Sequence, residues 1–496
     1  MTTVSAPHRT TRTLTSTPGR PTGLTQLDQM VARLQEAAPA FVRLSLGDRI
    51  ALARSMQAGY LRLARRMVEV ACAAKGIPVD SPVAGEEWAT GPWPVVRQLR
   101  LIIESLQSIQ RTGTTPIGRL GRNAEGRLTV QVFPTNRIDG VLSSGITVDV
   151  HLLPEVTPET VDATRASFYK GGKHEGRTVL VLGAGNITSI PAMDVITKLF
   201  NEGSVCLVKV NPVNAYIGPF IEEAFAEPIA RGFVAVAYGG ADEGAYLVQH
   251  RGIDEIHLTG SAATYDSIVW GPPGQEREAR KARNQPLVTK RITAELGNVS
   301  PVLVVPGPYS QKELAFRAEN IAGAVTCNAS FLCNSAKMLV TPKSWVRRPE
   351  LLNAVERILA AVPPRKAYYP GADQRWRELT GGRTQMRTVG TPSQGELPWT
   401  ILAGLDAADA GDPAFTTEPF CSVLSETEVG SDDPVEFLDR AVDFANNRLW
   451  GTLSADIVVH PKSLKDPRIA EALERANSWC SRCADKLVAA GATSEE

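Results

Sequence analysis

One cysteine in this chain, Cys333, lies in a segment where a nucleophile could be activated. It ends the run Asn328-Ala-Ser-Phe-Leu-Cys333, which follows a stretch of small residues with helical character, Ala318 to Val325. A thiolate attacks carbonyl carbon readily when a helix terminus or a nearby cation lowers the pKa of the thiol. A free cysteine is more often an inert core residue, so the position alone leaves both readings open. Cys327 precedes Asn328 and is expected to be a packed thiol.

Three further polar residues stand at the ends of predicted strands. Glu295 ends a strand-like run, so its carboxylate could act as a general base or be an ordinary solvated side chain. Asn186 follows a buried strand, where a carboxamide could donate to an oxyanion or simply shape a turn. Lys209 ends the next apolar strand and could contact a nucleotide ribose or phosphate. Gly183-Ala-Gly185 is not a GxGxxG fingerprint because position 188 is threonine, so the dinucleotide signal by itself is weak.

The elements that would position these residues alternate between strands and helices. Apolar strand-like runs are separated by the helical stretches Pro191 to Phe200 and Ile217 to Ala230. This alternation predicts βαβ units and a doubly wound parallel sheet with a ligand at the carboxyl ends of its strands. Residues 271–288 are charged and rich in proline and glycine, which indicates a surface loop or an inserted segment. A second α/β unit is expected to begin near residue 290.

The first part of the chain has a different pattern. From Leu24 to about Gly76, and again from Val95 to Ile109, apolar residues recur at helical spacing. Two alternating runs, residues 127–133 and 145–152, then predict antiparallel strands that project as an arm. Residues 1–23 contain basic but no acidic residues, as an organellar transit peptide does, but they lack an amphipathic stripe. Their threonine, serine and proline content favours a disordered tail.

Composition argues against several classes of protein. Lys+Arg and Asp+Glu both number 53, so the zero net charge gives no general attraction to nucleic acid or to an anionic membrane. No apolar run is long enough to cross a membrane. The seven cysteines are scattered and odd in number, which favours free thiols in the cytoplasm. The lone CxxC, Cys480 to Cys483, has no second pair and no nearby histidine, so no metal site is predicted.

The order and spacing of the polar residues resemble the aldehyde dehydrogenase superfamily, from about Leu24 to Ile457. The segments that carry the resemblance are Asn186, Lys209 (209 − 186 = 23 residues later), His257-Leu-Thr-Gly260-Ser261, Glu295-Leu-Gly-Asn-Val-Ser-Pro301, Asn328 to Cys333, Glu418-Pro-Phe420 and Ala445-Asn446-x-x-x-x-Gly451. The resemblance implies an aldehyde dehydrogenase-like α/β fold. Its parts would be an N-terminal helical region and Rossmann-type nucleotide-binding domain over 24–289, an α/β catalytic domain over 290–457, and a β-arm for oligomerisation near 127–152.

The resemblance also implies a role for each residue. Cys333 would attack an aldehyde, and the Asn186 side chain and the Cys333 backbone N–H would hold the oxyanion of the resulting thiohemiacetal. Hydride transfer to NAD or NADP would leave a thioester, which water activated by Glu295 would hydrolyse to the acid. The residues implied to bind the cofactor are Lys209, Gly260, Ser261, Glu418 and Phe420.

The chain departs from the family pattern at several positions. Pro212 stands where many NAD-preferring members have glutamate, which leaves NAD versus NADP open. Asn298 replaces a glycine of the base motif, and Phe331 and Leu332 replace polar residues before the cysteine, which leaves the subfamily and the aldehyde open. Residues 458–496 have no counterpart of the family's last strand, which pairs across subunits. The resemblance therefore implies a homo-oligomer weakened by an atypical C-terminal segment.

Two other functions fit the same residues. An acylating aldehyde dehydrogenase or acyl-CoA reductase would use Cys333 but pass the acyl group to or from coenzyme A, and Glu295 argues mildly for hydrolysis instead. A non-catalytic scaffold that kept the fold is the second alternative. The joint presence of Cys333, Glu295 and Asn186 argues against the scaffold, and the atypical terminus argues for it. A small-molecule aldehyde is the expected substrate, with no nucleic-acid or membrane partner.

Overall fold

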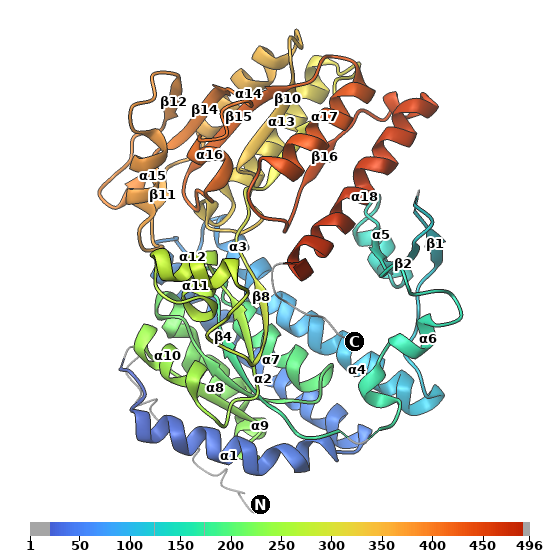
Figure 1. Cartoon of the computed structure of the whole chain (residues 1–496), viewed down its shortest axis with the longest axis vertical. Coiled ribbons are helices and arrows are strands. Elements are labelled where there is room, and N and C mark those ends of the chain that lie inside the picture. The colour runs from blue at the N-terminus through green and yellow to red at the C-terminus, as the bar shows by residue number, and fades with distance from the viewer. Residues whose placement is uncertain (1–19, 124, 173, 490–496) are drawn as a thin grey trace, which may run out of the picture.

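The structure, a computed structural model, describes residues 20–489 with the exception of 124 and 173. The chain folds into two lobes with an arm beside them (Figure 1). The lower lobe holds the N-terminal helices and one sheet, and the upper lobe holds a second sheet. The tail expected over residues 1–23 lies almost wholly outside the described residues. Within it, the Thr22 hydroxyl accepts a hydrogen bond from the Tyr238 backbone N–H at 2.9 Å, which attaches the chain to the lower lobe.

The N-terminal region is helical, as the periodicity predicts. Its helices are α1 (Leu24–Val42), α2 (Leu46–Lys75), α3 (Ala84–Thr90) and α4 (Pro92–Thr112). Helix α2 begins after Ser45, whose hydroxyl accepts from the Asp48 N–H, and ends at Gly76, whose φ of 69° is a left-handed conformation that glycine adopts without strain. The buried face of α2 is mostly apolar, with one buried cation near its start, Arg49, and another at its last residue, Lys75.

The lower lobe contains the predicted parallel sheet. Five strands pair in the order β6-β5-β4-β7-β8, and every pairing is parallel. The strands are β4 (Thr178–Leu182), β5 (Val205–Lys209), β6 (Val234–Ala237), β7 (Glu255–Thr259) and β8 (Arg291–Glu295). The helices between them are α7 (Ile190–Phe200), α8 (Gly218–Ala224), α9 (Ala226–Ala230), α10 (Ala241–Gln249) and α11 (Ala262–Val269). Strand β5 is buried throughout, as a central strand covered on both faces must be.

Three details differ from the sequence-based expectations. The helix expected from Ile217 to Ala230 is broken at Phe225 into α8 and α9. The segment 271–288, expected to be a surface loop or an inserted segment, contains the helix α12 (Gln275–Ala282), whose Arg277 turns inward and donates to the Gly271 carbonyl at 2.8 Å. Strand β8, expected to open the second unit at residue 290, pairs with β7 as the fifth strand of the first sheet, so the second sheet begins only with β9.

The upper lobe is built on a six-stranded sheet of order β12-β14-β15-β10-β9-β16. Only β12 runs antiparallel, at one edge of the sheet. The strands are β9 (Pro301–Val304), β10 (Met338–Pro342), β12 (Met386–Val389), β14 (Trp399–Leu405), β15 (Val423–Val429) and β16 (Asp456–Val458). The main helices are α13 (Gln311–Thr326), α14 (Arg348–Ala361), α15 (Ala372–Thr380) and α17 (Pro434–Asn447). The carboxyl end of α13 and the start of β10 frame the segment that carries Cys333.

The arm is an antiparallel sheet, as the alternating runs predict. It consists of β1 (Leu120–Arg122), β2 (Leu128–Phe133) and β3 (Val148–His151), with α5 (Arg137–Leu142) between the last two strands. No residue of α5 is buried, and its side chains Ile138, Val141 and Leu142 are 71%, 77% and 81% exposed. Three large apolar side chains exposed on one short helix of the arm form a surface that is unusual for contact with water.

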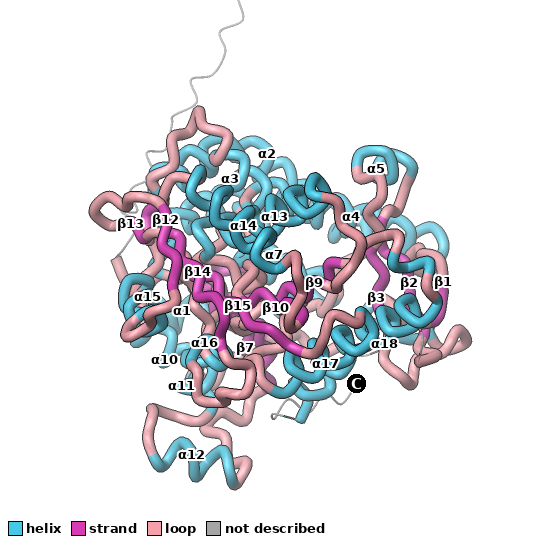
Figure 2. Tube along the Cα trace, turned by 90° about the horizontal axis from the view of Figure 1, so that it is seen from above, coloured by secondary structure: helices cyan, strands magenta, loops and turns pink. Residues whose placement is uncertain are grey.

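After β16 the described chain forms no further strand and ends in α18 (Pro467–Ala489). Helix α18 runs from the upper lobe toward the arm and packs along α17 (Figures 1 and 2). Its residues Glu474 and Asn477 and the arm residues 119–123 line opposite sides of a cleft of about 810 Å³. Within the described part of the chain, no helix is both long and apolar enough to cross a membrane.

Candidate active site

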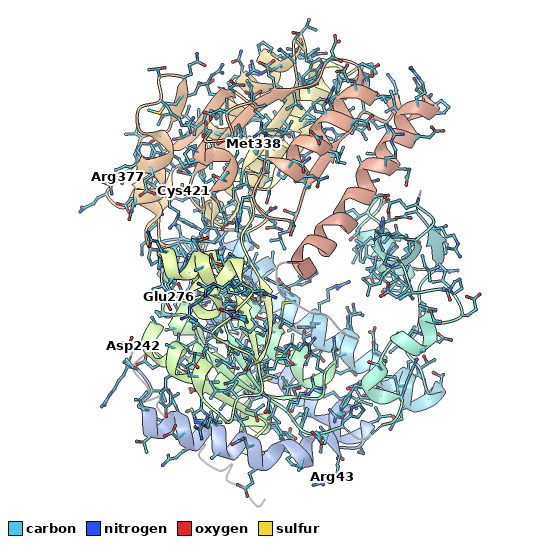
Figure 3. All side chains as sticks on the ribbon, viewed as in Figure 1. Arg43, Asp242, Glu276, Met338, Arg377 and Cys421 are labelled. Atoms are coloured by element: carbon cyan, nitrogen blue, oxygen red, sulfur yellow. The ribbon has the colours of Figure 1, made fainter. Side chains whose placement is uncertain are left out.

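Cys333 lies on the loop that joins α13 to β10, between the two lobes. Helix α13 ends at Thr326, and a tight 3-10 turn, η3 (Cys327–Ser330), reverses the chain before it reaches Cys333. The Cys333 side chain is partly buried, and its carbonyl accepts a hydrogen bond from the Ser300 hydroxyl at 3.1 Å. Helix α13 presents its C-terminus to this loop, and the partial negative charge there disfavours a thiolate, so this helix does not supply the activation considered in the sequence. Cys421 and Met338, labelled in Figure 3, lie in the same upper lobe, whereas Asp242 and Glu276 lie in the lower one.

The backbone before Cys333 has an uncommon conformation. Asn328, Ala329 and Ser330 have φ values of 50°, 54° and 67°, which is the left-handed region that residues other than glycine rarely occupy. Such a run persists only where surrounding groups hold it. Two carbonyls of the loop are held by buried donors: Lys337 Nζ bonds the Ser330 carbonyl at 2.9 Å, and Asn328 Nδ2 bonds the Phe331 carbonyl at 3.1 Å.

Asn186 meets this loop from the other lobe. It lies in the turn after β4, is 8% exposed, and its Nδ2 donates to the Phe331 carbonyl at 2.9 Å. Phe331 stands two residues before Cys333 in the loop. Asn186 and Cys333, which are far apart in the sequence, are therefore brought to one place by a direct contact between the first sheet and the nucleophile loop.

Charged groups converge on the Cys333 thiol. Burial raises its pKa, the Glu418 carboxylate raises it further and Glu295 adds to this, whereas the Lys337 ammonium lowers it. Lys337 is fully buried, and burial lowers its own pKa to about 8 against the attraction of Glu418. Its Nζ also lies 5.6 Å from the centre of the Phe420 ring. One buried cation thus opposes two carboxylates around a single sulfur atom.

Glu295 and Glu418 approach the site from different parts of the chain, Glu295 from the end of β8 and Glu418 from the loop before β15. Glu295 ends β8 with an exposed side chain, and its carbonyl accepts from the Gly260 N–H at 3.0 Å. Glu418 folds over the segment that follows Glu295: its Oε1 accepts from the Asn298 N–H at 3.3 Å, and its Oε2 would lie 2.0 Å from a Cβ on Gly297. A side chain at Gly297 would require the Glu418 carboxylate to move, so the glycine lets that carboxylate approach this segment closely. Burial also raises the pKa of Glu418, with Lys337 opposing.

The residues expected to bind a dinucleotide lie at the carboxyl ends of the first sheet. Lys209 ends β5 in a buried position, burial lowers its pKa against the attraction of Glu243, and its Nζ has only a 3.4 Å contact with the Val210 carbonyl. Ser261 caps α11, its hydroxyl accepting from the Thr264 N–H at 3.2 Å. A nearly unpartnered ammonium and the start of a helix at one sheet edge suit ribose hydroxyls and phosphates.

The segment after Lys209 supplies amides in place of a carboxylate. Pro212 begins the 3-10 turn η2 (Pro212–Ile217), so no acidic side chain stands at that position. Asn214 is buried, and its Nδ2 donates to the Ala184 carbonyl at 2.9 Å in the turn after β4. Its Oδ1 is buried without a hydrogen-bond partner among the described residues. The Nδ2 bond of Asn214 therefore ties the segment after Lys209 to the turn after β4.

Several residues of the site were not predicted from the sequence. Lys75, Glu86, Glu87, Lys337 and Tyr368 all contact the nucleophile loop or its neighbours. A signal for Lys75 was present, because Val68, Cys72 and Lys75 follow the helical spacing of a buried apolar face. A lysine on such a face needs an acidic or carbonyl partner elsewhere in the chain.

The remaining cysteines give a mixed result. Cys327, expected to be a packed thiol, is only partly buried, although burial still raises its pKa. The five cysteines whose side chains are described, residues 72, 206, 327, 333 and 421, are all free thiols. The side chains of Cys480 and Cys483 lie outside the described part of α18.

The fold and the arrangement of these residues are similar to those of aldehyde dehydrogenases. The sequence profile of the Aldehyde dehydrogenase family matches residues 185–364, which include Asn186, Lys209, Glu295 and Cys333. This match confirms the resemblance seen in the sequence. The profile begins at the turn after β4 and therefore does not include the N-terminal helices that complete the site.

Solved structures with the same fold cover most of the chain. An NADP-dependent glyceraldehyde-3-phosphate dehydrogenase from Bacillus halodurans C-125, complexed with NADP, superposes with a TM-score of 0.61 at 15% identity, covering 91% of this chain and 81% of that one. An NAD-dependent aldehyde dehydrogenase from Sinorhizobium meliloti gives 0.58 at 16% identity, over 92% and 78%. A salicylaldehyde dehydrogenase from Pseudomonas putida G7, complexed with salicylaldehyde, gives 0.59 at 14% identity, over 92% and 80%. At these identities the comparison establishes the fold.

Proposed function

We propose that this chain oxidises an aldehyde to a carboxylic acid with NAD or NADP, using Cys333 as the nucleophile. The observation that carries the proposal is the contact of Asn186 Nδ2 with the nucleophile loop at 2.9 Å, which joins an amide donor to the segment of the thiol. The charges of Lys337, Glu418 and Glu295 act on the same sulfur. Two of the structural relatives named above are described as NADP-dependent and NAD-dependent dehydrogenases, which supports the cofactor class.

In the first step, the Cys333 thiol releases its proton to solvent water and Sγ forms a bond to the aldehyde carbon. The carbonyl π electrons move to oxygen, which becomes an oxyanion. Asn186 Nδ2 carries two protons and the Phe331 carbonyl takes one of them, which leaves the other to donate to this oxyanion. The Cys333 backbone N–H is the second donor in the proposal, and one such donor typically contributes about 3–4 kcal/mol to the transition state.

The cofactor would be held along the carboxyl ends of the first sheet. Lys209 ends β5 at that edge, and Gly260 and Ser261 supply the start of α11. A bound nicotinamide would supply the hydride acceptor for this oxidation, and Cys333 would carry the acyl group that remains on its sulfur. Pro212 and the neutral Asn214 place no carboxylate against a 2′-phosphate, so NADP is compatible with this edge as well as NAD.

Release of the acid requires water and a base. Glu295 is exposed at the end of β8, so water reaches its carboxylate, and its charge acts on Cys333 from that position. In the proposed step it takes a proton from water as the oxygen attacks the thioester carbon, and the Cys333 sulfur leaves. The acylating and scaffold alternatives gain no support from the comparisons, which find dehydrogenases.

The direct test is formation of NADH or NADPH by the purified full-length chain with a panel of aldehydes. Product acid should form in step with the reduced cofactor without coenzyme A. Turnover that needs coenzyme A and yields an acyl-CoA would favour the acylating reaction instead. Absence of turnover with every aldehyde and both cofactors, together with measurable dinucleotide binding, would favour a scaffold.

We also propose that the arm mediates assembly of identical chains. The exposed apolar side chains of α5 have no cover within the described chain, and an antiparallel sheet with a free edge favours pairing with another chain. After β16 the described chain offers α18 in place of a further strand. We therefore expect assembly weaker than that of a chain whose last strand completes the pairing. The five free thiols, none of them in a disulfide, support a reducing compartment, and we propose the cytoplasm.

A further inference from the structure

Lys75 is a buried lysine whose three ammonium protons contact three different parts of the chain. Its Nζ lies 2.7 Å from Glu87 Oε1 in α3, 3.0 Å from Asn328 Oδ1 in the nucleophile loop, and 3.3 Å from the Asn186 carbonyl in the turn after β4. An ammonium has three donors and no acceptor, so this one is fully used. Lys75 and Glu87 are 4% and 1% exposed, and neither takes part in the chemistry proposed above.

The neighbouring Glu86 holds the same loop from a second point. Its Oε2 accepts from the Asn328 backbone N–H at 2.9 Å and from Arg365 Nη1 at 2.8 Å. Asn328 is the first of the three consecutive left-handed residues, so the bond is made where the strained segment begins. The Tyr368 hydroxyl adds a contact of 3.1 Å to Asn328 Oδ1 and another of 3.1 Å to the Asn186 carbonyl.

The position of α3 against the turn after β4 depends on a glycine. A Cβ on Gly91, directly after α3, would lie 2.4 Å from the Glu87 carbonyl and 3.1 Å from Thr188 Oγ1. Thr188 belongs to the same turn as Asn186. The absence of a side chain at Gly91 therefore lets α3 approach that turn closely enough for Glu87 to reach Lys75.

From these contacts we propose that Lys75, Glu86 and Glu87, named here the α2–α3 clamp, are positioning residues that hold Asn186 and the nucleophile loop in their reactive arrangement. The contacts of the clamp are independent of the proposed function, whereas its expected effect on catalysis rests on that function. It acts through Asn328 and the Asn186 backbone, so it touches neither thiol nor aldehyde. Loss of the clamp should let the left-handed segment relax and shift Cys333 away from the oxyanion donor.

The central test separates positioning from folding with a pair of substitutions. Lys75→Met alone leaves the Glu87 carboxylate buried without its cation and should destabilise the protein. Adding Glu87→Gln removes that carboxylate charge, so Lys75→Met/Glu87→Gln should recover much of the stability while the contacts to Asn328 and Asn186 stay lost. If the clamp positions the site, kcat stays about tenfold to a hundredfold below wild type in the recovered double variant, with cofactor affinity unchanged.

A second buried lysine–glutamate pair supplies the matched control. Lys198 Nζ lies 2.8 Å from Glu255 Oε1, both residues are at most 3% exposed, and Glu255 begins β7 at the amino ends of the strands, away from the site. Lys198→Met/Glu255→Gln perturbs an equally buried pair and should keep the wild-type kcat per folded molecule. An equal loss of kcat in this control would mean that general loosening, not the clamp, explains the effect.

Hydrogen exchange read by mass spectrometry tests the clamp without using the reaction. Residues 327–337 and 183–189 should exchange about tenfold faster in Lys75→Met/Glu87→Gln than in wild type or in the Lys198 control. Glu86→Ala, at a partly exposed position that should fold, must speed exchange in 327–337 as well. Wild-type exchange in both variants would overturn the proposal. Failure of the wild-type chain to oxidise any aldehyde would overturn the proposed function and leave the exchange result to decide on the clamp alone.

Discussion

Replacement of Lys337 by methionine should stabilise the protein near neutral pH while impairing Cys333. The lysine is fully buried and its ammonium has one hydrogen bond, to the Ser330 carbonyl at 2.9 Å. Burial lowers its pKa from 10.5 to about 8, so the unfolded chain binds this proton more tightly than the folded chain does. At 1.36 kcal/mol per pKa unit, the buried charge costs about 3 kcal/mol of folding free energy at pH values below about 8.

Methionine fills a similar volume without a charge. Loss of the bond to the Ser330 carbonyl leaves that acceptor buried and unpaired, which costs about 1–3 kcal/mol. The net effect of Lys337→Met near pH 7 is then a gain of about 1 kcal/mol, or about 2 kcal/mol if the carbonyl finds water. Because the wild-type penalty disappears as pH rises from about 8 to 10.5, the advantage of the variant should shrink over that range.

Urea denaturation of both proteins at a series of pH values measures this effect. The Cys333 thiol provides a second readout: its pKa should rise in Lys337→Met because the opposing cation is gone, which moves the pH midpoint of its alkylation upward. Lys198→Met, which removes a lysine paired with carboxylates at 2.8 and 2.9 Å, should instead destabilise the protein. If Lys337→Met is less stable than wild type at every pH, or if the stability difference does not change with pH, the reasoning is wrong.

Three further results are expected. Cys333→Ser should abolish aldehyde oxidation and leave dinucleotide binding intact, whereas Cys327→Ser should keep activity; the reverse pattern would assign the nucleophile to Cys327. Glu295→Gln should form the acyl-enzyme and then stall, seen as a stoichiometric burst of reduced cofactor, and steady turnover without a burst would remove Glu295 from the hydrolytic step. Replacing Val141 and Leu142 by serine should lower the association of the chain in sedimentation at micromolar concentration, and unchanged sedimentation would place any interface elsewhere.

The sequence allowed good prediction wherever a pattern is local. The buried run of β4 and β5 predicted a parallel sheet, and strand ends predicted the places of Asn186 and Lys209. Boundaries were harder, since β8 looks like the start of a second unit in the sequence and joins the first sheet only through its pairing with β7. The residues of a strand do not by themselves indicate which earlier strand it will pair with.

The part of the site that sequence did not predict is held by distant contacts. Glu86 and Glu87 sit on a seven-residue helix with no motif around them, and their role depends on residues that lie hundreds of positions later. Lys337 follows the nucleophile loop closely, but only the structure shows that it is buried beside Glu418 and Phe420. Local spacing could place Cys333 and Glu295 in the site, yet it could not show what holds them there.

The separation of these contacts along the chain has a kinetic consequence. The bond from Lys75 to Asn328 closes a loop of 253 residues, and that from Asn328 to Glu86 closes one of 242. Contacts of such range form late in folding, because the chain loses the entropy of closing the loop before the contact contributes any stabilising free energy. A refolding chain should therefore regain its helices and both sheets before it regains an ordered nucleophile loop. A fragment limited to residues 185–364 would contain Cys333, Glu295 and Asn186 and still lack the helices that order them.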